Sequence, residues 1–375
     1  MDLGSFFNIF RAGSLAFTWG NSLMIIIGLV LIYLAIVKEY EPVLLLPIGF
    51  GCILANLGMA ASATGDGFLS VLYRAGIQSE LFPLLIFIGV GGMIDFSPLL
   101  AQPHLALLGA AGQFGIYGTL ILATLIGFNL NEAASIGVIG AIDGPTAIYV
   151  AGKLAPEMLA PIAVAAYSYM SLVPIIQPPI MKLLTTRKER LIRMEYSPKP
   201  ISKKALIIFP IAVTIVISLL APTAAPLIAA LMLGNLLKES GVVDRLNKSA
   251  QNEIINISTL FLGLTIGGTM TAASFLNWNT LFILGLGLLA FVLDTAAGVM
   301  FGKLMSFVTG GKINPLIGAC GISAFPMAGR LSAKMAQDED FENFILMHAM
   351  GSNTAGQLGS VIAGGLLLTL VLGLQ

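Results

Sequence analysis

The sequence predicts an all-α polytopic membrane protein with about 9–12 membrane elements, an internal repeat, and two broken helices or re-entrant hairpins. Three observations support this class. The 375 residues are 57% hydrophobic and only 10% charged, whereas soluble domains carry about 25% charged residues. Apolar stretches of about 20 residues, the length that crosses a hydrocarbon core, recur from end to end. Two stretches rich in glycine and proline interrupt this pattern.

The apolar stretches indicate a single membrane domain over residues 1–375. An amphipathic interfacial helix is expected over residues 1–20, with Trp19 at headgroup level. Clear spans are expected, in chain order, at residues 21–37, 43–59, 81–94, 105–128, 159–176, 205–220, 221–237, 254–273, 281–299 and 355–374.

The charge distribution orients the chain and limits its partners. Nineteen Lys and Arg balance nineteen Asp and Glu, so no basic face for a nucleic acid is expected. The loop over residues 182–204 nevertheless contains eight basic and two acidic residues. The positive-inside rule places this loop in the cytoplasm. The loop could serve topology alone, or it could also dock a soluble partner.

Two weak internal similarities occur at nearly one offset. The segment VGGMIDFSPLL, 90–100, is similar to IGGTMTAASFL, 266–276, and GPTAIYVAGKL, 144–154, is similar to GISAFPMAGRL, 321–331. Together they predict a duplicated unit, roughly 81–155 and 257–332, linked through the basic loop 182–204. Transporters are commonly built from such repeats. The sequence leaves open whether the repeats are inverted, and chance similarity between Gly- and Ala-rich helices is the alternative.

Each predicted unit contains an interrupted stretch at the corresponding position. These stretches are GVIGAIDGPTAIYVAGK, 137–153, and INPLIGACGISAFPMAGR, 313–330. Irregular backbone at membrane depth is tolerated only inside protein or beside water, because lipid cannot satisfy free N–H and C=O groups. The two interruptions are therefore the expected positions of a binding site.

Asp143 is the main candidate in the first interruption. No basic residue lies within nine positions of it, and a charge at the bilayer centre costs about 2.5–3.5 kcal/mol on insertion scales. A bound cation would compensate this charge, with Thr146 and the DGP turn supplying further oxygens. The alternative is a helix N-cap outside the membrane, because Asp followed by Gly-Pro is typical of caps and turns.

The second interruption offers a neutral set of oxygens. Asn314, Ser323 and carbonyls near Gly318 are suited to an alkali cation, although Asn314 and Ser323 could simply cap two half-helices. Arg330 could bind a carboxylate, or it could extend to the membrane interface at the end of an apolar run.

Four further side chains are candidates within apolar segments. Tyr169, and Tyr167 beside it, could coordinate a cation or pass a proton, with an aromatic-belt position as the alternative. Asp95 and Asp294 could belong to a functional relay, or they could mark the ends of spans. When the two repeat units are aligned, neither residue matches an acid in the other unit.

Motifs of several enzyme classes are missing from the sequence. It contains no P-loop, GxSxG, HExxH or CxxC pattern. This argues against an ATPase, a serine hydrolase and a zinc enzyme. A gradient, or a reaction supplied elsewhere, must therefore drive any transport.

Long motifs resemble the β subunits of the sodium-pumping biotin-dependent decarboxylases, which act on oxaloacetate, methylmalonyl-CoA, glutaconyl-CoA or malonate. The resemblance covers almost the whole chain and is carried by TWGNSLMIIIGLVLIYLAI, EPVLLLPIGFGCILAN, ASIGVIGAIDGPTAIYVAGKLAP, GKINPLIGACGISAFPMAGR and GSNTAGQLGSVIAGG.

This resemblance implies a function and a complex. A carboxyltransferase α subunit moves CO2 from the substrate to biotin on a biotin carrier subunit. The β subunit then decarboxylates carboxybiotin and exports Na+ while consuming a proton. It further implies a small membrane-anchoring subunit, a homotrimer with scaffold and moving core domains, and a multi-pass position in the bacterial inner membrane. Carboxybiotin is carried by the partner and is not covalently bound here.

The resemblance also assigns residues. One Na+ and proton site comprises Asp143 and Tyr169, and a second Na+ site comprises Asn314, Gly318 and Ser323. Arg330 corresponds to a functionally important arginine near the carboxybiotin headgroup, with Ser323 nearby. We expect Asp143 to alternate between Na+-bound and protonated states while Tyr169 helps to pass the proton. The alternative functions are a gradient-driven secondary transporter without catalytic activity and a subunit that only anchors a decarboxylase.

Overall fold

The computed structural model describes residues 17–57, 67–141, 143–195 and 200–374, and these residues form helices without any strand. The all-α membrane class is therefore confirmed. The expected interfacial helix falls mainly on residues 1–16, outside the described part. The helices, with π- and 3-10 turns marked η, are α2 (Trp19–Val37), α3 (Pro42–Ala55), α4 (Phe68–Leu72), η1 (Tyr73–Gln78), α5 (Leu81–Met93), α6 (Ser97–Ala101), α7 (Leu105–Ala111), α8 (Phe114–Ile126), α9 (Leu130–Gly137), η2 (Val138–Ala141), α10 (Gly144–Leu154), η3 (Pro156–Met158), α11 (Leu159–Leu184), α12 (Arg187–Arg190), α13 (Lys203–Leu220), η4 (Pro222–Ala224), α14 (Ala225–Ser240), α15 (Asp244–Ser249), η5 (Ala250–Ile254), α16 (Ile255–Thr269), α17 (Ala272–Phe275), α18 (Trp278–Val308), η6 (Pro315–Gly321), α19 (Met327–Glu339) and α20 (Leu346–Gly373).

Five of the described helical segments are long and apolar enough to cross a membrane: α2, α7 with α8, α13, α18 and α20. Two bent pairs raise this number to seven. The first is Phe68–Gln78 with Leu81–Met93, bent by 58°, and the second is Pro156–Met170 with Leu172–Leu184, bent by 65°. Other expected spans correspond to shorter helices, α3, α14 and α16, and to the two interrupted stretches.

The helices pack into two groups. In the first, which we call the α3 group, α3 lies between α2 and α16, and α5 packs against α14, which also contacts α13. In the second, the α18 group, α18 contacts α8, α11, η2 and η6, while α20 contacts α7, α19 and η6. The two groups meet along α5, α10, α11 and α20.

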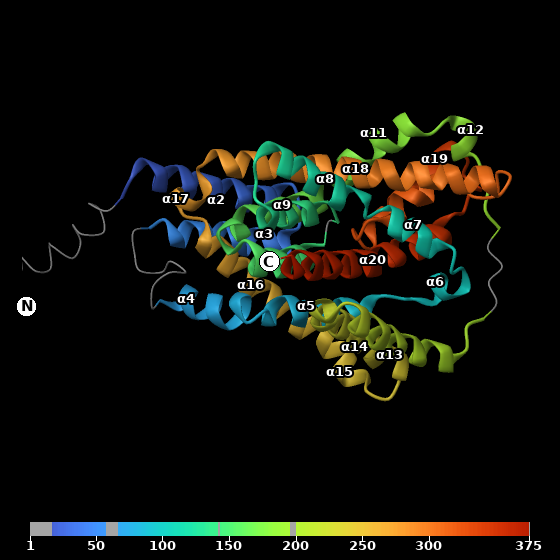
Figure 1. The fold of residues 1–375 in the computed structure, drawn as a ribbon, viewed down its shortest axis with the longest axis horizontal. Coiled ribbons are helices and arrows are strands. Elements are labelled where there is room, and N and C mark those ends of the chain that lie inside the picture. Colours follow the sequence, from blue (N-terminus) through green and yellow to red (C-terminus); the bar gives the residue numbers. More distant parts are fainter. Residues whose placement is uncertain (1–16, 58–66, 142, 196–199, 375) are drawn as a thin grey trace, which may run out of the picture.

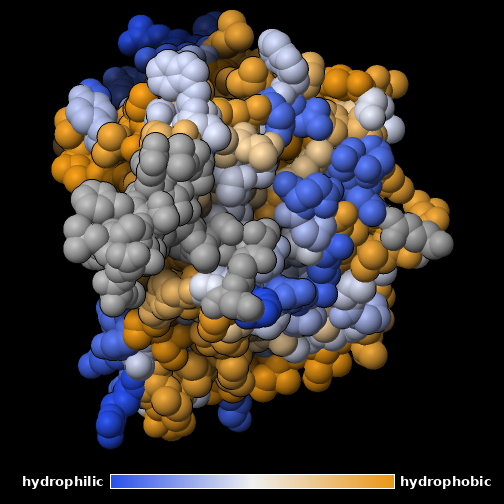
Figure 2. Space-filling view, turned by 90° about the vertical axis from the view of Figure 1, so that its left-hand side faces the viewer, coloured by the Kyte–Doolittle hydropathy of each residue, from blue (hydrophilic) through white to orange (hydrophobic). Residues whose placement is uncertain are grey.

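The basic loop defines one end of the molecule, which we call the loop end. There Glu339 of α19 forms ion pairs with Arg187 and Arg190 of α12, on the right of Figure 1. α13 starts after this loop and ends at η4, which therefore lies at the opposite end, the far end. Figure 2 looks onto the far end, where hydrophilic side chains mix with apolar ones and apolar ones dominate the bottom edge.

The outer faces of two helices carry apolar side chains. Leu219 and Leu220 of α13 are 78% and 70% exposed, and α2 is exposed at Leu29 and Ile36. In water such faces would lose the hydrophobic stabilisation of burial, but lipid chains are as apolar as these side chains. The faces therefore fit a lipid environment or a further membrane subunit.

The two predicted repeat units contain their elements in the same order. α5 and α6 in the first correspond to α16 and α17 in the second, and α10 corresponds to α19. α10 extends to the far end, where Tyr149 donates a hydrogen bond to the Thr223 carbonyl of η4 at 3.2 Å. α19 extends to the loop end. The duplication itself stays a prediction.

Candidate functional site

The two interrupted stretches meet inside the protein. In the first, the 3-10 turn η2 precedes the start of α10, and in the second, η6 is followed by irregular backbone until α19 begins. The backbone N–H of Ser323 donates to the Ala141 carbonyl at 3.2 Å, and the Ser323 hydroxyl donates to the same oxygen. The Ala141 carbonyl and the Ser323 N–H are thus satisfied by protein, as membrane depth requires.

Asp143 is the N-cap of α10 and is 4% exposed. Its Oδ2 accepts hydrogen bonds from the Thr146 hydroxyl at 2.8 Å and the Gln357 amide at 3.1 Å, and it lies 3.2 Å from the Ser360 hydroxyl. Its Oδ1 accepts from the Thr146 N–H at 3.4 Å. The two interpretations of Asp143, as a helix N-cap and as a functional residue, are therefore compatible. Within the described part of the chain no ion pair reaches this carboxylate, so a cation or a proton must balance its charge.

A cavity of about 600 Å³ opens beside Asp143, between the two helix groups. The α18 group contributes Asp143, Ser323, Arg330 and Gln357 to its lining. The α3 group contributes the first turns of α3 and α16 and the second half of α5. These parts lie towards the loop end, so the cavity occupies that half of the molecule.

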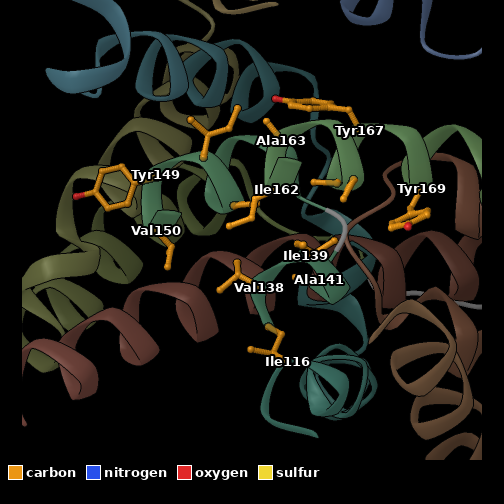
Figure 3. Close-up of a cluster of buried hydrophobic side chains, with 14 of the residues drawn as sticks. Ile116, Val138, Ile139, Ala141, Tyr149, Val150, Ile162, Ala163, Tyr167 and Tyr169 are labelled. Atoms are coloured by element: carbon orange, nitrogen blue, oxygen red, sulfur yellow. The ribbon is translucent and has the colours of Figure 1, made fainter. Parts of the chain in front are cut away.

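Tyr167 and Tyr169 project from α11 in different directions (Figure 3). Tyr167 lines the cavity and lies against Gly144, where a Cβ atom would be 2.6 Å from the Tyr167 hydroxyl. Tyr169 is 8% exposed and donates to the Leu284 carbonyl of α18. The structure therefore brings Tyr167, not Tyr169, next to Asp143 in this conformation.

Asn314 and Gly318 lie away from the cavity lining. Asn314 caps η6 by accepting from the Leu316 N–H at 3.0 Å, and its amide donates to the carbonyls of Arg190 and Ile192, both at 2.9 Å. Gly318 packs directly on Gly298 of α18, whose carbonyl a Cβ atom on Gly318 would overlap. These two residues hold η6 against the basic loop and α18, and only Ser323 of the predicted second Na+ site lines the cavity.

Arg330 lies in the first turn of α19, with its side chain exposed and lining the cavity. Among the described residues its guanidinium has no hydrogen-bond or ion-pair partner, although the acid Asp95 lines the same cavity. A guanidinium that faces a cavity in this way is available to a carboxylate ligand.

Two donors to Asp143 on α20, Gln357 and Ser360, are not among the site residues that the sequence predicts. They stand three positions apart on an apolar helix, a spacing that puts both on one face.

A second buried acid, Asp294, is 0% exposed; its Oδ1 accepts from the Gly115 N–H, and its Oδ2 has no hydrogen-bond partner among the described residues. It lies against Gly140, on the α18 side of η2.

Comparisons with known proteins identify the family. The family model described as Na+-transporting oxaloacetate decarboxylase beta subunit matches residues 20–371. The chain belongs to this family. It is 53% identical to glutaconyl-CoA decarboxylase subunit beta of Acidaminococcus fermentans, with 96% of both chains covered. It is 54% identical to methylmalonyl-CoA decarboxylase subunit beta of Veillonella parvula, covering 96% of this chain and 95% of the relative. Identity to the oxaloacetate decarboxylase beta chain of Klebsiella pneumoniae is 47%, with 94% and 95% covered.

These matches confirm the resemblance found in the sequence motifs. The chain is a multi-pass membrane β subunit of the Na+-transporting decarboxylases.

Proposed function

We propose that the chain decarboxylates carboxybiotin carried by a partner subunit and exports Na+, with consumption of one proton. The observation that carries this proposal is the cavity at the loop end. It combines a buried carboxylate held only by neutral donors, Asp143, with an unpaired guanidinium, Arg330. The first suits a cation and the second suits a carboxylate.

Na+ is the cargo, and Asp143 is its primary ligand. The cation replaces the neutral hydrogen-bond donors at Oδ2 and draws further oxygens from Thr146, Ser323 and Gln357, all in contact with Asp143 or lining the same cavity. Oxygen-only coordination of this kind is what hard cations prefer. The other Na+ ligands that the family resemblance implies require a different conformation. In it Tyr169 of α11 approaches Asp143, and η6 presents Asn314 and Gly318 to the second site.

Arg330 binds the carboxylate of carboxybiotin, and Asp143 supplies the proton. Breaking the N–CO2 bond leaves the electron pair on the ureido nitrogen, which takes up one proton as CO2 departs. Protonated Asp143 provides that proton as Na+ binds, so the carboxylate exchanges one positive charge for another. Tyr167 stands beside Asp143 in this structure, whereas the predicted passage of the proton through Tyr169 requires that residue to leave Leu284.

The partners follow from the same function. We assign a biotin carrier and a carboxyltransferase α subunit to the loop end, which the positive-inside rule places in the cytoplasm of a bacterium, with the chain in its inner membrane. A small anchoring subunit and two further copies of the chain, making a homotrimer, would cover part of the exposed apolar faces of α2 and α13.

One assay separates the proposed function from its rivals. The chain is reconstituted in liposomes, alone and with its co-expressed partner subunits, and CO2 release and 22Na+ movement are followed together after addition of free carboxybiotin. Coupled CO2 release and Na+ movement is the expected result. Na+ movement without CO2 release would favour a secondary transporter. Neither, even with the partner subunits present, would favour an anchor.

A further inference from the structure

Helix α5 has an acid at each end. One of them forms an ion pair with a cation of the opposite helix group, and the other lines the same cavity as such a cation. Glu80 caps its start at the far end, and Asp95 follows its last turn at the loop end. The corresponding cations are Lys153 on α10 and Arg330 on α19. These two basic residues occupy matching positions in the predicted repeats, 177 residues apart.

The far-end pair is closed. Lys153 Nζ lies 2.5 Å from Glu80 Oε1, and the same ammonium stands 5.1 Å from the centre of the Tyr149 ring. Tyr149 in turn donates to η4, so three segments converge at this point. Among the ion pairs of the described residues, this is the one that joins the α3 group to the α18 group.

The loop-end pair is open. Asp95 and Arg330 line the same cavity without forming an ion pair. Among the described residues, the Asp95 carboxylate accepts a hydrogen bond only from the nearby Ser97 N–H, at 2.9 Å. The cavity therefore separates the groups at the loop end, while the Lys153 pair holds them together at the far end. α10 connects the two features directly, since it begins at Asp143 and ends one residue after Lys153.

We propose that Lys153 and Glu80 form the latch of a far-side gate, and that an Arg330–Asp95 pair replaces the latch when the α18 group moves to release Na+. This proposal rests on the proposed function, because it describes how a cation bound at Asp143 leaves on the side opposite to the cavity. Movement of the α18 group along α5 exchanges one ion pair for another. The two conformations then differ little in electrostatic energy, as a transport cycle requires.

Arg330 thereby gains a second role. Bound carboxybiotin occupies the guanidinium and keeps it from Asp95, so the loop end stays open while the headgroup is present. Once CO2 has left, the carboxylate that held Arg330 no longer exists, and the guanidinium is released to Asp95. The order of events, decarboxylation before release of Na+, follows from this competition.

The test is carried out without carboxybiotin and measures which end of the molecule is open. Cys52 and Cys320 are replaced by Ala, and Thr259→Cys on the cavity wall is labelled by a membrane-impermeant maleimide from the far side. Glu80→Gln should raise the labelling rate about two- to fivefold, the range expected for a partly exposed ion pair. The charge swap Glu80→Lys with Lys153→Glu should restore the original rate, and Asp95→Asn should lower it.

The matched control is Glu157→Gln, an exposed acid just after α10, which should leave labelling unchanged. A second measurement uses Glu80→Cys with Lys153→Cys, joined by a reducible bis-methanethiosulfonate cross-linker, which spans a longer distance than a disulfide. Cross-linking this pair should stop 22Na+ transport, and reduction of the cross-link should restore it. Unchanged labelling in Glu80→Gln, or transport through the cross-linked pair, would overturn the latch. Labelling needs no turnover, so its rate still measures whether the gate is open in a chain that does not pump. If the chain pumps normally but the substitutions leave the labelling rate unchanged, the latch is refuted and the proposed function is not.

Discussion

The two interruptions of the bundle share a backbone form and differ in chemistry. Each places a 3-10 turn against α18 and then starts a helix, α10 or α19. The first ends in a carboxylate, Asp143, that faces a cavity and accepts only neutral donors. The second starts with an amide, Asn314, whose two N–H groups are both used by carbonyls of the basic loop.

The difference shows that the same backbone form can present different groups at its two occurrences. Free backbone groups at membrane depth need partners in either case. In this conformation the first break contains a carboxylate without a counter-charge among the described residues, and the second contains an amide whose donors are satisfied by backbone carbonyls. Substitutions at the two breaks should therefore affect different measurements.

The largest effect is expected at the first break. Asp143→Asn keeps the shape and removes the negative charge, so the affinity for Na+ should fall about 100-fold, the equivalent of about 2.8 kcal/mol. Binding of 22Na+ to detergent-purified protein measures it. Asp244→Asn, at an exposed acid of α15, is the matched control. A variant at Asp143 that kept Na+-dependent decarboxylation and pumping would remove the basis of the comparison.

Arg330→Gln should raise the KM for carboxybiotin about 30-fold and leave Na+ binding unchanged. A guanidinium–carboxylate pair is charge-assisted and contributes about 2 kcal/mol when water is excluded. Arg330→Lys should recover only part of this affinity, because an ammonium cannot form the bidentate contact. The KM of each variant is measured from the steady-state rate of decarboxylation as a function of carboxybiotin concentration. Equal loss of Na+ binding would indicate that Arg330 shapes the ion site instead.

Parts of this site could be predicted from the sequence, and parts could not. Asp143 stands out because an isolated carboxylate in an apolar run is costly anywhere in a bilayer. Its donors Gln357 and Ser360 do not, since neutral polar residues on α20 acquire meaning only when α10 packs beside them. The same holds for Tyr167 and Tyr169, because the choice between them depends on the direction of α11.

The fold shows the same division. The apolar runs predict most of the helices, but α20 begins at Leu346 rather than near 355, and α18 extends to Val308 rather than 299. The added turns of α20 contain His348, Ser352 and Asn353, polar residues that are buried against other helices. Hydropathy ends a span at such residues, whereas tertiary packing continues the helix. The pairing of acidic Glu339 and Asp340 with the basic loop is likewise a long-range contact.

Gly318→Ala should separate packing from ion binding at the second break. An added methyl group would meet the Gly298 carbonyl and lie 3.2 Å from the Val299 N–H, both fixed parts of α18. Overpacking of this kind costs about 1–3 kcal/mol. The midpoint of thermal unfolding in detergent should fall, while Gly152→Ala, where a Cβ meets nothing within 4 Å, should leave it unchanged. Loss of Na+ binding at an unchanged midpoint would instead support a ligand role for Gly318.

Asn314→Ala should loosen the basic loop by a smaller amount. The variant loses the cap bond from the Leu316 N–H and two hydrogen bonds to the carbonyls of Arg190 and Ile192. Asn343 donates to the same two carbonyls at 3.0 and 3.3 Å and remains. The net cost is therefore about 1 kcal/mol. Tryptic cleavage within the loop should accelerate about fivefold, and Asn343→Ala should do the same. If Asn314→Ala abolished Na+ binding without altering cleavage, the second break would be an ion site after all.

The smallest effect concerns pH at the loop end. Hydrogen bonds from Arg190, followed by those from Arg187, lower the pKa of Glu339 below its usual 4.5. Because the folded-state pKa is the lower one, these ion pairs stabilise the loop above pH 4.5 and lose that contribution as pH falls through the lowered value. A spin label on α12 should therefore stay immobile from pH 7 down to 4.5 and gain mobility only as the pH falls below that value. Glu339→Gln should already be mobile at pH 7. Since Asn314 and Asn343 do not titrate, the gain should be partial, and complete release of the loop would show that charge rather than amide hydrogen bonding holds the second break.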